Sequence, residues 1–175
     1  MEILNLEGCT SFNNLDSIFG VLHDIKFLWK LCLTKFLRKI NFSEIGIKEL
    51  PSNIGSLTYL EMLNLSGCSK FKKFPDIFAN LGHLRELDLS NSGIKELPSS
   101  IGSLTSLEIL DFTECSKFEK FPDIFANLGH LRNLYLDWRV LKNSQVALDI
   151  WNPLKLLASH FVQTLRIFQR SQGLI

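Results

Sequence analysis

The sequence of 175 residues lacks the features that mark several large functional classes. Nineteen Lys and Arg residues against 18 Asp and Glu residues leave a net charge of +1, so no long-range field favours nucleic acid or an anionic membrane. The phosphate-binding motifs G-x-x-x-x-G-K-[ST] and G-x-G-x-x-G are absent. The metal-binding and redox motifs C-x-x-C and H-E-x-x-H are absent too. We therefore expect no enzyme, no cofactor and no metal site.

Export and membrane signals are also missing. The first residues, Met1-Glu2-Ile3, lack the basic start of a secretory signal. The most apolar run, residues 17–33, contains Asp24, Lys26 and Lys30. Because a charge at the centre of a spanning helix costs about 2.5–3.5 kcal/mol, this run is a poor membrane span. We expect a soluble protein.

Four cysteines leave two interpretations open. Cys9, Cys68 and Cys115 occupy the same phase of a repeating unit. If the units stack as strands about 4.8 Å apart, Cys68 and Cys115 lie two units and roughly 10 Å apart, beyond the ~7 Å reach of a disulfide. Disulfides remain the alternative, but buried free thiols in a reducing compartment are the preferred interpretation.

What the sequence does contain is a repeat. The pattern L-x-x-L-x-L returns every 23 or 24 residues from position 37 onward, which is the signature of a leucine-rich repeat. Its units start at Met1, Leu37, Leu60, Leu84, Leu107 and Leu131. The alternation at L-x-L predicts short parallel strands with one buried face and one wet face. We therefore predict an α/β fold: a horseshoe-shaped solenoid over residues 1–137, with the strands on the concave face.

Prolines mark the other side of each unit. Pro51, Pro75, Pro98 and Pro122 all fall 14 or 15 residues after a unit start. We expect them at the first position of short helical turns on the convex face.

Two segments break the repeat. Between Met1 and Leu37 lie 36 residues, which predicts an irregular segment at 18–36. Residues 138–175 do not repeat, and we expect a helical tail there that caps the stack. Its apolar residues recur at three- and four-residue steps: Leu154, Leu157, Phe161, Leu165 and Phe168. Residues 139–175 carry a local net charge of +4, so a membrane surface or a partner groove is the alternative role.

Two copies of a two-unit block, residues 46–91 and 93–138, locate candidate contact residues. Of 46 aligned pairs, 34 are identical and 12 differ. All eight pairs expected on the wet strand face differ: Met62/Ile109, Asn64/Asp111, Ser66/Thr113, Gly67/Glu114, Glu86/Asn133, Asp88/Tyr135, Ser90/Asp137 and Asn91/Trp138. Four differences fall elsewhere: Asn53/Ser100, Tyr59/Ser106, Leu65/Phe112 and Lys72/Glu119.

These differences predict a protein-binding surface on the concave face, although drift of exposed residues remains the alternative. The predicted contact residues are Asn64, Ser66, Glu86, Asp88, Ser90, Asp111, Thr113, Glu114, Asn133, Tyr135, Asp137 and Trp138. The surface is polar, becomes more acidic along the chain and ends in aromatic residues. That composition suits a protein contact with an aromatic anchor.

The segments "LNLSGCSKFKKFP", "IKELPSSIGSLTSLEIL" and "CSKFEKFPDIFANLGHLREL" resemble the leucine-rich-repeat region of plant intracellular disease-resistance proteins of the TIR, nucleotide-binding class. The resemblance covers roughly residues 1–137. It implies a cytosolic or nuclear module of an immune receptor that binds a pathogen effector or a host protein and restrains the nucleotide switch. No TIR or nucleotide-binding domain is present in these 175 residues, so a fragment or a truncated paralogue is expected.

Two other functions stay open. Intracellular signalling scaffolds of the plant Ras-group type also use L-P-x-x-I-G-x-L units, but they predict uniform 23-residue repeats. The alternating C-S-K-F units argue against that interpretation. The third hypothesis is a non-functional truncated product.

Overall fold

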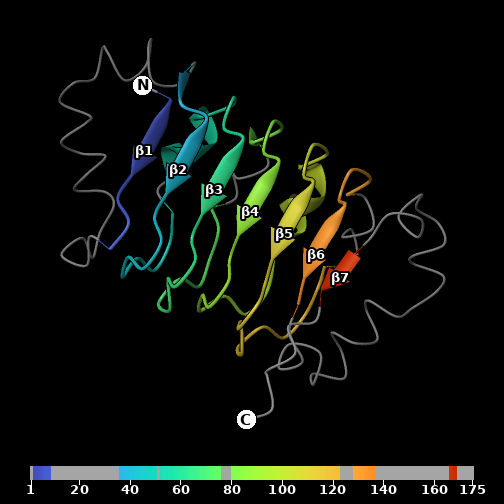
Figure 1. Cartoon of the computed structure of the whole chain (residues 1–175). Coiled ribbons are helices and arrows are strands. Elements are labelled where there is room, and N and C mark those ends of the chain that lie inside the picture. The colour runs from blue at the N-terminus through green and yellow to red at the C-terminus, as the bar shows by residue number, and fades with distance from the viewer. Residues whose placement is uncertain are drawn as a thin grey trace.

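The computed structural model describes residues 2–8, 36–50, 52–75, 80–122, 128–136 and 166–168. In this part of the chain, seven three-residue strands form one sheet (Figure 1). The strands are β1 (Ile3–Asn5), β2 (Lys39–Asn41), β3 (Met62–Asn64), β4 (Glu86–Asp88), β5 (Ile109–Asp111), β6 (Asn133–Tyr135) and β7 (Arg166–Phe168).

Every strand pairs in parallel with its neighbour in the sequence. Lys39 is the register partner of Met62, and Met62 is the partner of Glu86. These partners are separated by 23 and 24 residues, the same steps as the unit starts. The predicted solenoid of parallel strands is therefore confirmed, with the rest of each unit acting as the crossover that parallel pairing requires.

The middle residue of each strand from β2 to β6 points into the core. Ile40, Leu63 and Leu87 have no exposed surface, and the same holds for Cys68 and Cys115. Phenylalanines fill the space behind them: the ring of Phe112 lies 4.6 Å from that of Phe118, centroid to centroid. Stacked units thus share one continuous core, because no single unit buries enough apolar surface by itself.

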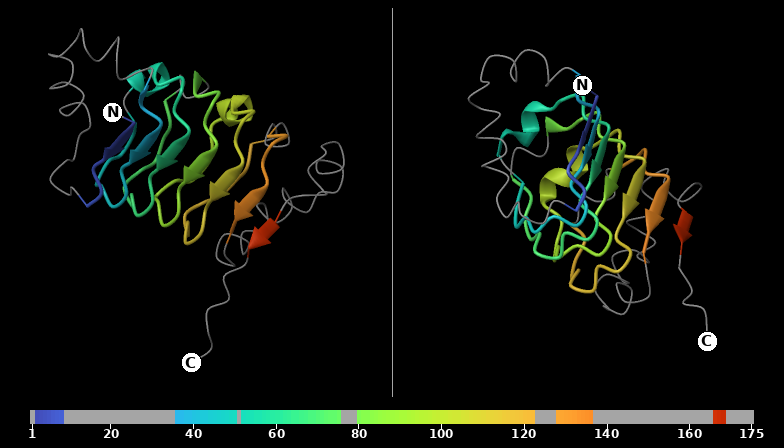
Figure 2. Two further views of the ribbon diagram at one scale, coloured as in Figure 1. Left: turned by 45° about the horizontal axis from the view of Figure 1, so that its top comes forward. Right: turned by 60° about the vertical axis from the view of Figure 1, so that its left-hand side comes forward.

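Short 3₁₀ helices lie on the side of the solenoid opposite the sheet (Figure 2). They are η2 (Ser52–Ser56) and η4 (Ser99–Ser103). Pro98 stands at the N-cap of η4 with φ −67° and ψ 152°, one position before the first helical residue. The prediction of a helical turn is confirmed here, but Pro98 precedes the helix instead of opening it. The fixed φ of proline suits both positions.

Most of the irregular segment at 18–36 lies outside the described residues, as does most of the tail. The predicted cap helix is wrong for Arg166–Phe168, because these residues form β7 beside β6. The apolar pattern of the tail fits a helix, but β6 offers an open parallel edge, and pairing with that edge satisfies the backbone of a short segment equally well. Residues 138–165 and 169–175 of the expected tail lie outside the described residues.

Candidate functional site

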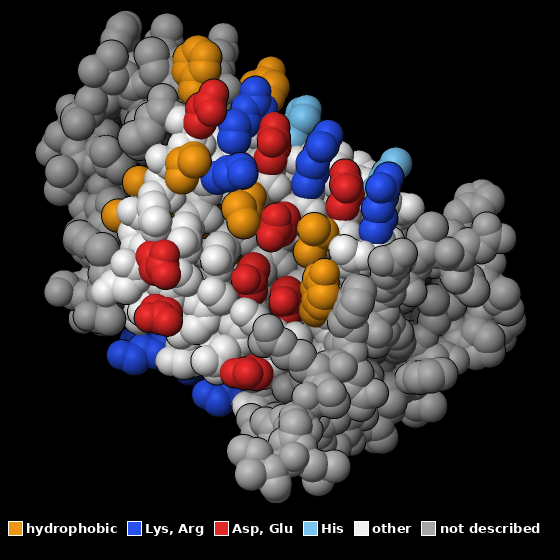
Figure 3. Space-filling view, viewed as in Figure 1, with side chains coloured by type: hydrophobic (Ala, Val, Ile, Leu, Met, Phe, Trp, Pro, Cys, Tyr) orange, Lys and Arg blue, Asp and Glu red, His pale blue; other side chains and the backbone are white. Residues whose placement is uncertain are grey.

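The first and third residue of each strand form the face of the sheet that points away from the core, and we call it the open sheet face. Its first row contains Ile3, Lys39, Met62, Glu86, Ile109 and Asn133, and its second row contains Asn5, Asn41, Asn64, Asp88, Asp111 and Tyr135. From Met62 onward these residues are half-buried, since each stands among neighbours from adjacent strands. Figure 3 shows acidic and hydrophobic side chains side by side over β3 to β6.

The structure brings together ten of the twelve predicted contact residues. Six lie in the strands of the open sheet face: Asn64, Glu86, Asp88, Asp111, Asn133 and Tyr135. Four follow in the turns after the strands: Ser66, Ser90, Thr113 and Glu114. Asp137 and Trp138 lie outside the described residues. The positions are those expected, and the binding role stays a prediction.

The third residue of each strand closes its own turn. Asn64 Oδ1 accepts a hydrogen bond of 2.8 Å from the backbone N–H of Ser66. Asp111 Oδ1 accepts one of 2.7 Å from the backbone N–H of Thr113 and another of 2.7 Å from its hydroxyl. The same Asx turns begin at Asn5, Asn41 and Asp88. Asn and Asp favour such turns, so the Asn64/Asp111 difference keeps the turn and changes only the charge.

This turn role was missed at the sequence level, although its signal is visible. Asn or Asp stands at the fifth position of the first five units, followed two residues later by Ser or Thr in four of them. Recognising the turn requires knowing that the strand ends at that residue, which the three-residue strands show. Part of the predicted contact surface is therefore also structural.

The eighth position of each of the first five units has a left-handed backbone. Its φ is 70° at Gly67, 52° at Asn91, and 61° and 62° at Glu44 and Glu114. Glycine adopts this conformation freely, whereas another residue pays roughly 1–2 kcal/mol. The Gly67/Glu114 difference thus places a carboxylate beside the open sheet face at a cost in backbone energy.

Carboxylates concentrate at the centre of the open sheet face. Glu86 shares β4 with Asp88, and the register partner of Asp88 is Asp111. The pKa of Glu86 is raised, first by burial and then by the negative charges of Asp88 and Asp111, while Lys39 lowers it in part. The register partners of Glu86 on either side are Met62 and Ile109, so the acidic centre has apolar neighbours.

Along the upper edge in Figure 3, acidic and basic side chains alternate from unit to unit. In the sequence, acidic and basic residues alternate in the same way at the second position of the units: Glu2, Arg38, Glu61, Arg85, Glu108 and Arg132. Arg38 Nη1 lies 3.5 Å from Glu61 Oε1, and Arg85 Nε lies 3.9 Å from Glu108 Oε1. Opposite charges on neighbouring strands favour the observed register.

Tyr59 is an exposed aromatic residue at this edge, with 40% of its surface accessible. The guanidinium carbon of Arg38 lies 5.1 Å from the centroid of its ring, within cation–π range. The ring of His83 lies 5.3 Å away on the next unit. Its counterpart in the second copy is Ser106, so this aromatic contact belongs to the first copy alone.

Comparison with known proteins agrees with this geometry. The family described as leucine-rich repeat region matches residues 1–170. The chain belongs to this family. Within the described part of this leucine-rich repeat chain, no helix is long and apolar enough to cross a bilayer, and no three His, Cys, Asp or Glu residues are grouped to hold a metal ion.

Relatives with known names come from plants. Arabidopsis thaliana At4g19050, which is named as a disease resistance protein, is 29% identical over 44% of this chain and 5% of its own length. The A. thaliana disease resistance protein RPS4B is 31% identical over 44% of this chain and 9% of its own length. The resemblance to plant disease-resistance proteins is thus confirmed. The chain spans less than a tenth of either relative.

Among solved structures, the leucine-rich repeat ectodomain of the plant membrane receptor kinase GASSHO1/SCHENGEN3 from A. thaliana is similar. Its TM-score is 0.47 and its identity 20%, and the match covers 81% of this chain and 20% of the receptor chain.

Proposed function

We propose that this leucine-rich repeat chain is the protein-recognition module of a plant disease-resistance receptor, and that it binds its partner on the open sheet face. The observation that carries the proposal is that the two copies differ at the six described pairs of this face and its turns: Met62/Ile109, Asn64/Asp111, Ser66/Thr113, Gly67/Glu114, Glu86/Asn133 and Asp88/Tyr135. The names of the plant relatives support the immune context. The proposal assigns binding, not catalysis, to the chain.

Exposure alone does not explain where the two copies differ. Lys48/Lys95, Glu49/Glu96 and His83/His130 are exposed in both copies and identical. The two copies do differ at three pairs that are half-buried and therefore less exposed: Met62/Ile109, Asn64/Asp111 and Glu86/Asn133. If exposed residues had simply drifted, the more exposed pairs should have changed first. Variation that follows one face favours a contact surface.

The chemistry of the face suits a partner segment that is basic and apolar. A lysine or arginine of the partner would meet Glu86, Asp88 and Asp111, whose mutual repulsion a cation relieves. Apolar partner groups would cover Met62 and Ile109, and an aromatic contact at Tyr135 would add a well-packed anchor. Solenoids commonly bind extended partners along such a surface.

We place the module in the cytosol or nucleus because its described cysteines form no disulfide. Cys68 and Cys115 are buried and form no disulfide, which confirms the sequence prediction for these two residues. Cys9 and Cys32 lie outside the described residues. Unpaired thiols are typical of a reducing compartment.

A display experiment tests the binding face. Random 16-residue peptides on phage are selected on the full chain, and the best-enriched peptide is resynthesised with a fluorescent label. The double variant Asp88→Asn, Asp111→Asn keeps both turn acceptors and removes both charges. We expect it to weaken peptide binding at least tenfold, with Lys117→Gln, an exposed residue outside the open sheet face, as an unchanged control. Equal affinity for wild type and the double variant would overturn the assignment.

A further inference from the structure

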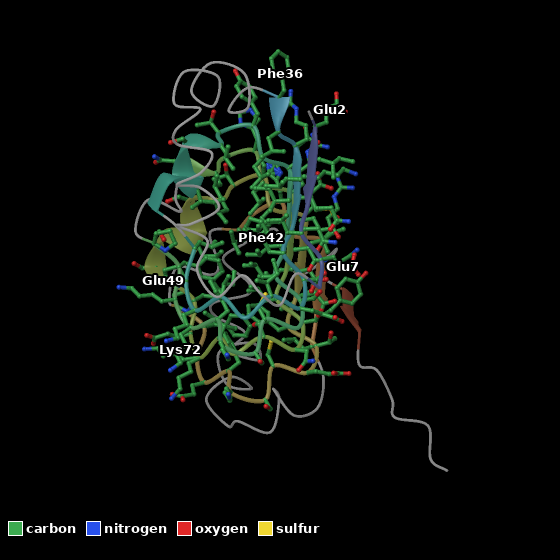
Figure 4. All side chains as sticks on the ribbon, turned by 90° about the vertical axis from the view of Figure 1, so that its left-hand side faces the viewer. Glu2, Glu7, Phe36, Phe42, Glu49 and Lys72 are labelled. Carbon is green, nitrogen blue, oxygen red and sulfur yellow. The ribbon has the colours of Figure 1, made fainter. Side chains whose placement is uncertain are left out.

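A second charged surface lies away from the open sheet face. In Figure 4, Glu49 and Lys72 lie on the side of the molecule opposite Glu7, which follows β1. Here residues 48–49 run beside residues 72–73: the backbone N–H of Lys72 donates to the carbonyl of Lys48 at 2.9 Å, and Glu49 bridges in parallel to Lys73. The equivalent segments of the second block pair in the same way: the backbone N–H of Glu119 donates to the carbonyl of Lys95 at 2.7 Å.

The two blocks differ in whether the lysine of this backbone pair, Lys48 or Lys95, has an acidic neighbour. In the second block, Lys95 Nζ lies 3.3 Å from Glu119 Oε1 and forms an ion pair. In the first block, Lys72 replaces the glutamate, so Lys48 has a second lysine beside it. Like charges side by side on neighbouring strands destabilise a sheet. The Lys72/Glu119 difference therefore lies outside the open sheet face and carries its own electrostatic cost.

Neighbouring lysines increase the charge of the first block. Lys70 and Lys73 flank Lys72, and all four lysines of this surface are exposed. With Glu49 included, the surface carries four positive charges and one negative charge, a net of +3. The matching surface of the second block has Lys95, Lys117 and Lys120 against Glu96 and Glu119, a net of +1. Within the described residues, Lys48, Lys70 and Lys72 form no ion pair.

We propose that Lys48, Lys70 and Lys72 form a docking site for an acidic peptide segment of a partner protein. Carboxylates of such a segment would take the place that Glu119 occupies beside Lys95, and would remove the repulsion between Lys48 and Lys72. The site is independent of the open sheet face and requires no result from it.

An acidic peptide suits this surface better than a nucleic acid does. Lys48 and Lys72 lie on neighbouring backbone segments, about 4.8 Å apart in a parallel ladder, so a pair of carboxylates spans them. Glu49 and Glu96 stand on the same side of the solenoid, where they would repel a continuous phosphate backbone. The net charge of +1 for the whole chain gives no field to hold a polyanion beyond the patch.

The test uses the full chain and a fluorescein-labelled 12-residue peptide in which Asp and Glu alternate with Gly and Ser. Fluorescence anisotropy at low salt gives the affinity. Lys72→Glu places a glutamate beside Lys48, as Glu119 stands beside Lys95 in the second block. We therefore expect at least tenfold weaker peptide binding together with an unchanged or higher melting temperature. Lys72→Gln, which adds no new ion pair, should also weaken binding severalfold. Glu119→Lys should strengthen peptide binding, because it puts two lysines side by side in the second block as well.

Matched variants distinguish this site from general surface charge. Lys70→Glu should weaken binding, whereas Lys117→Glu at the equivalent place of the second block should change the affinity less than twofold. Equal losses from these two variants, or full affinity in Lys72→Glu, would overturn the proposal. Single-stranded DNA of equal charge and phosphatidylserine vesicles complete the test. If either binds more tightly than the peptide and loses binding with Lys72→Glu, the acidic peptide is the wrong occupant.

Discussion

The thiol of Cys68 donates a hydrogen bond of 3.0 Å to the carbonyl oxygen of Phe42, one unit earlier in the stack. Cys115 repeats the contact with the carbonyl of Leu89 at 2.9 Å. Both thiols have no exposed surface. Each cysteine thus joins two consecutive units through a backbone carbonyl that also accepts a backbone hydrogen bond within its own unit. The role is structural, which has consequences for reactivity.

Alkylation should measure the burial of Cys68. Burial raises the pKa of its thiol from 9.0 to about 11, with a backbone hydrogen bond at Ile45 lowering it in part. At pH 8 the reactive thiolate is then about a hundredfold scarcer in the folded than in the unfolded chain. We expect iodoacetamide to label Cys68 at least a hundredfold more slowly in buffer than in urea, as read by peptide mass spectrometry. Similar rates in the two conditions would contradict the buried, protonated thiol.

The same shift predicts a loss of stability in alkali. Because the folded-state pKa of Cys68 exceeds the unfolded value, the stabilisation is complete below about pH 9 and is lost as pH rises toward 11. Urea denaturation at pH 8.5 and pH 10.5 measures how much the free energy of unfolding falls over this interval. Cys68→Ala has no thiol to titrate, so its stability should fall less over this interval than that of the wild type. Parallel slopes would show that Cys68 is not the titrating group.

The Asx turns predict that charge and stability can be separated at Asp111. Asp111→Ala leaves the N–H and hydroxyl of Thr113 without their acceptor and should lower the free energy of unfolding by about 1–2 kcal/mol. Asp111→Asn keeps an acceptor and should cost less than half as much. Asn64→Ala and Asn64→Asp provide the same comparison in the first copy. An Asn variant as unstable as the Ala variant would argue that the charge, not the turn, stabilises this site.

Much of the fold is predictable because one constraint repeats. Alternation at L-x-L leaves only one residue per strand facing the core, and a shift of one position would expose Leu63 and Leu87 together. Periodicity also predicts the buried phenylalanines and Cys68. These features depend on hydrophobic burial, which a single sequence records directly.

The features that were missed depend on contacts between units. The ion pair of Arg38 with Glu61 and the contacts of Tyr59 with Arg38 and with His83 require the register of neighbouring units, not the pattern within one unit. At Arg166–Phe168, the helical spacing of apolar residues was overridden by pairing with β6. Local pattern is a weak guide where a neighbouring edge supplies the hydrogen bonds.

Replacing the strained glutamate should stabilise the chain. Glu114 has φ 62°, a conformation that glycine adopts without steric cost. We expect Glu114→Gly to raise the free energy of unfolding by about 0.5–1 kcal/mol, measured by urea denaturation, and to weaken binding at the open sheet face. Gly67→Ala at the matching position should destabilise the chain by a similar amount. A less stable Glu114→Gly variant would mean that contacts of the Glu114 side chain outweigh its backbone strain.

Gly93 should tolerate no side chain, because units three and four meet there. A Cβ atom at this position would approach the backbone oxygens of Ser69 and Phe71, to 2.9 Å in the case of Phe71, so the backbone of the preceding unit would have to shift. The N–H of Gly93 also donates to the carbonyl of Cys68 at 3.1 Å. We expect Gly93→Ala to lower the free energy of unfolding by about 3 kcal/mol, at the upper end of overpacking effects.

Gly82 offers a matched control for that variant. Nothing lies within 4 Å of a Cβ atom built at Gly82, and its backbone does not have a left-handed φ. Gly82→Ala should therefore change the free energy of unfolding by less than about 0.5 kcal/mol. Urea denaturation monitored by circular dichroism gives the free energy of unfolding of both variants. If Gly93→Ala is as stable as Gly82→Ala, the two units do not pack as closely at residue 93 as the structure shows.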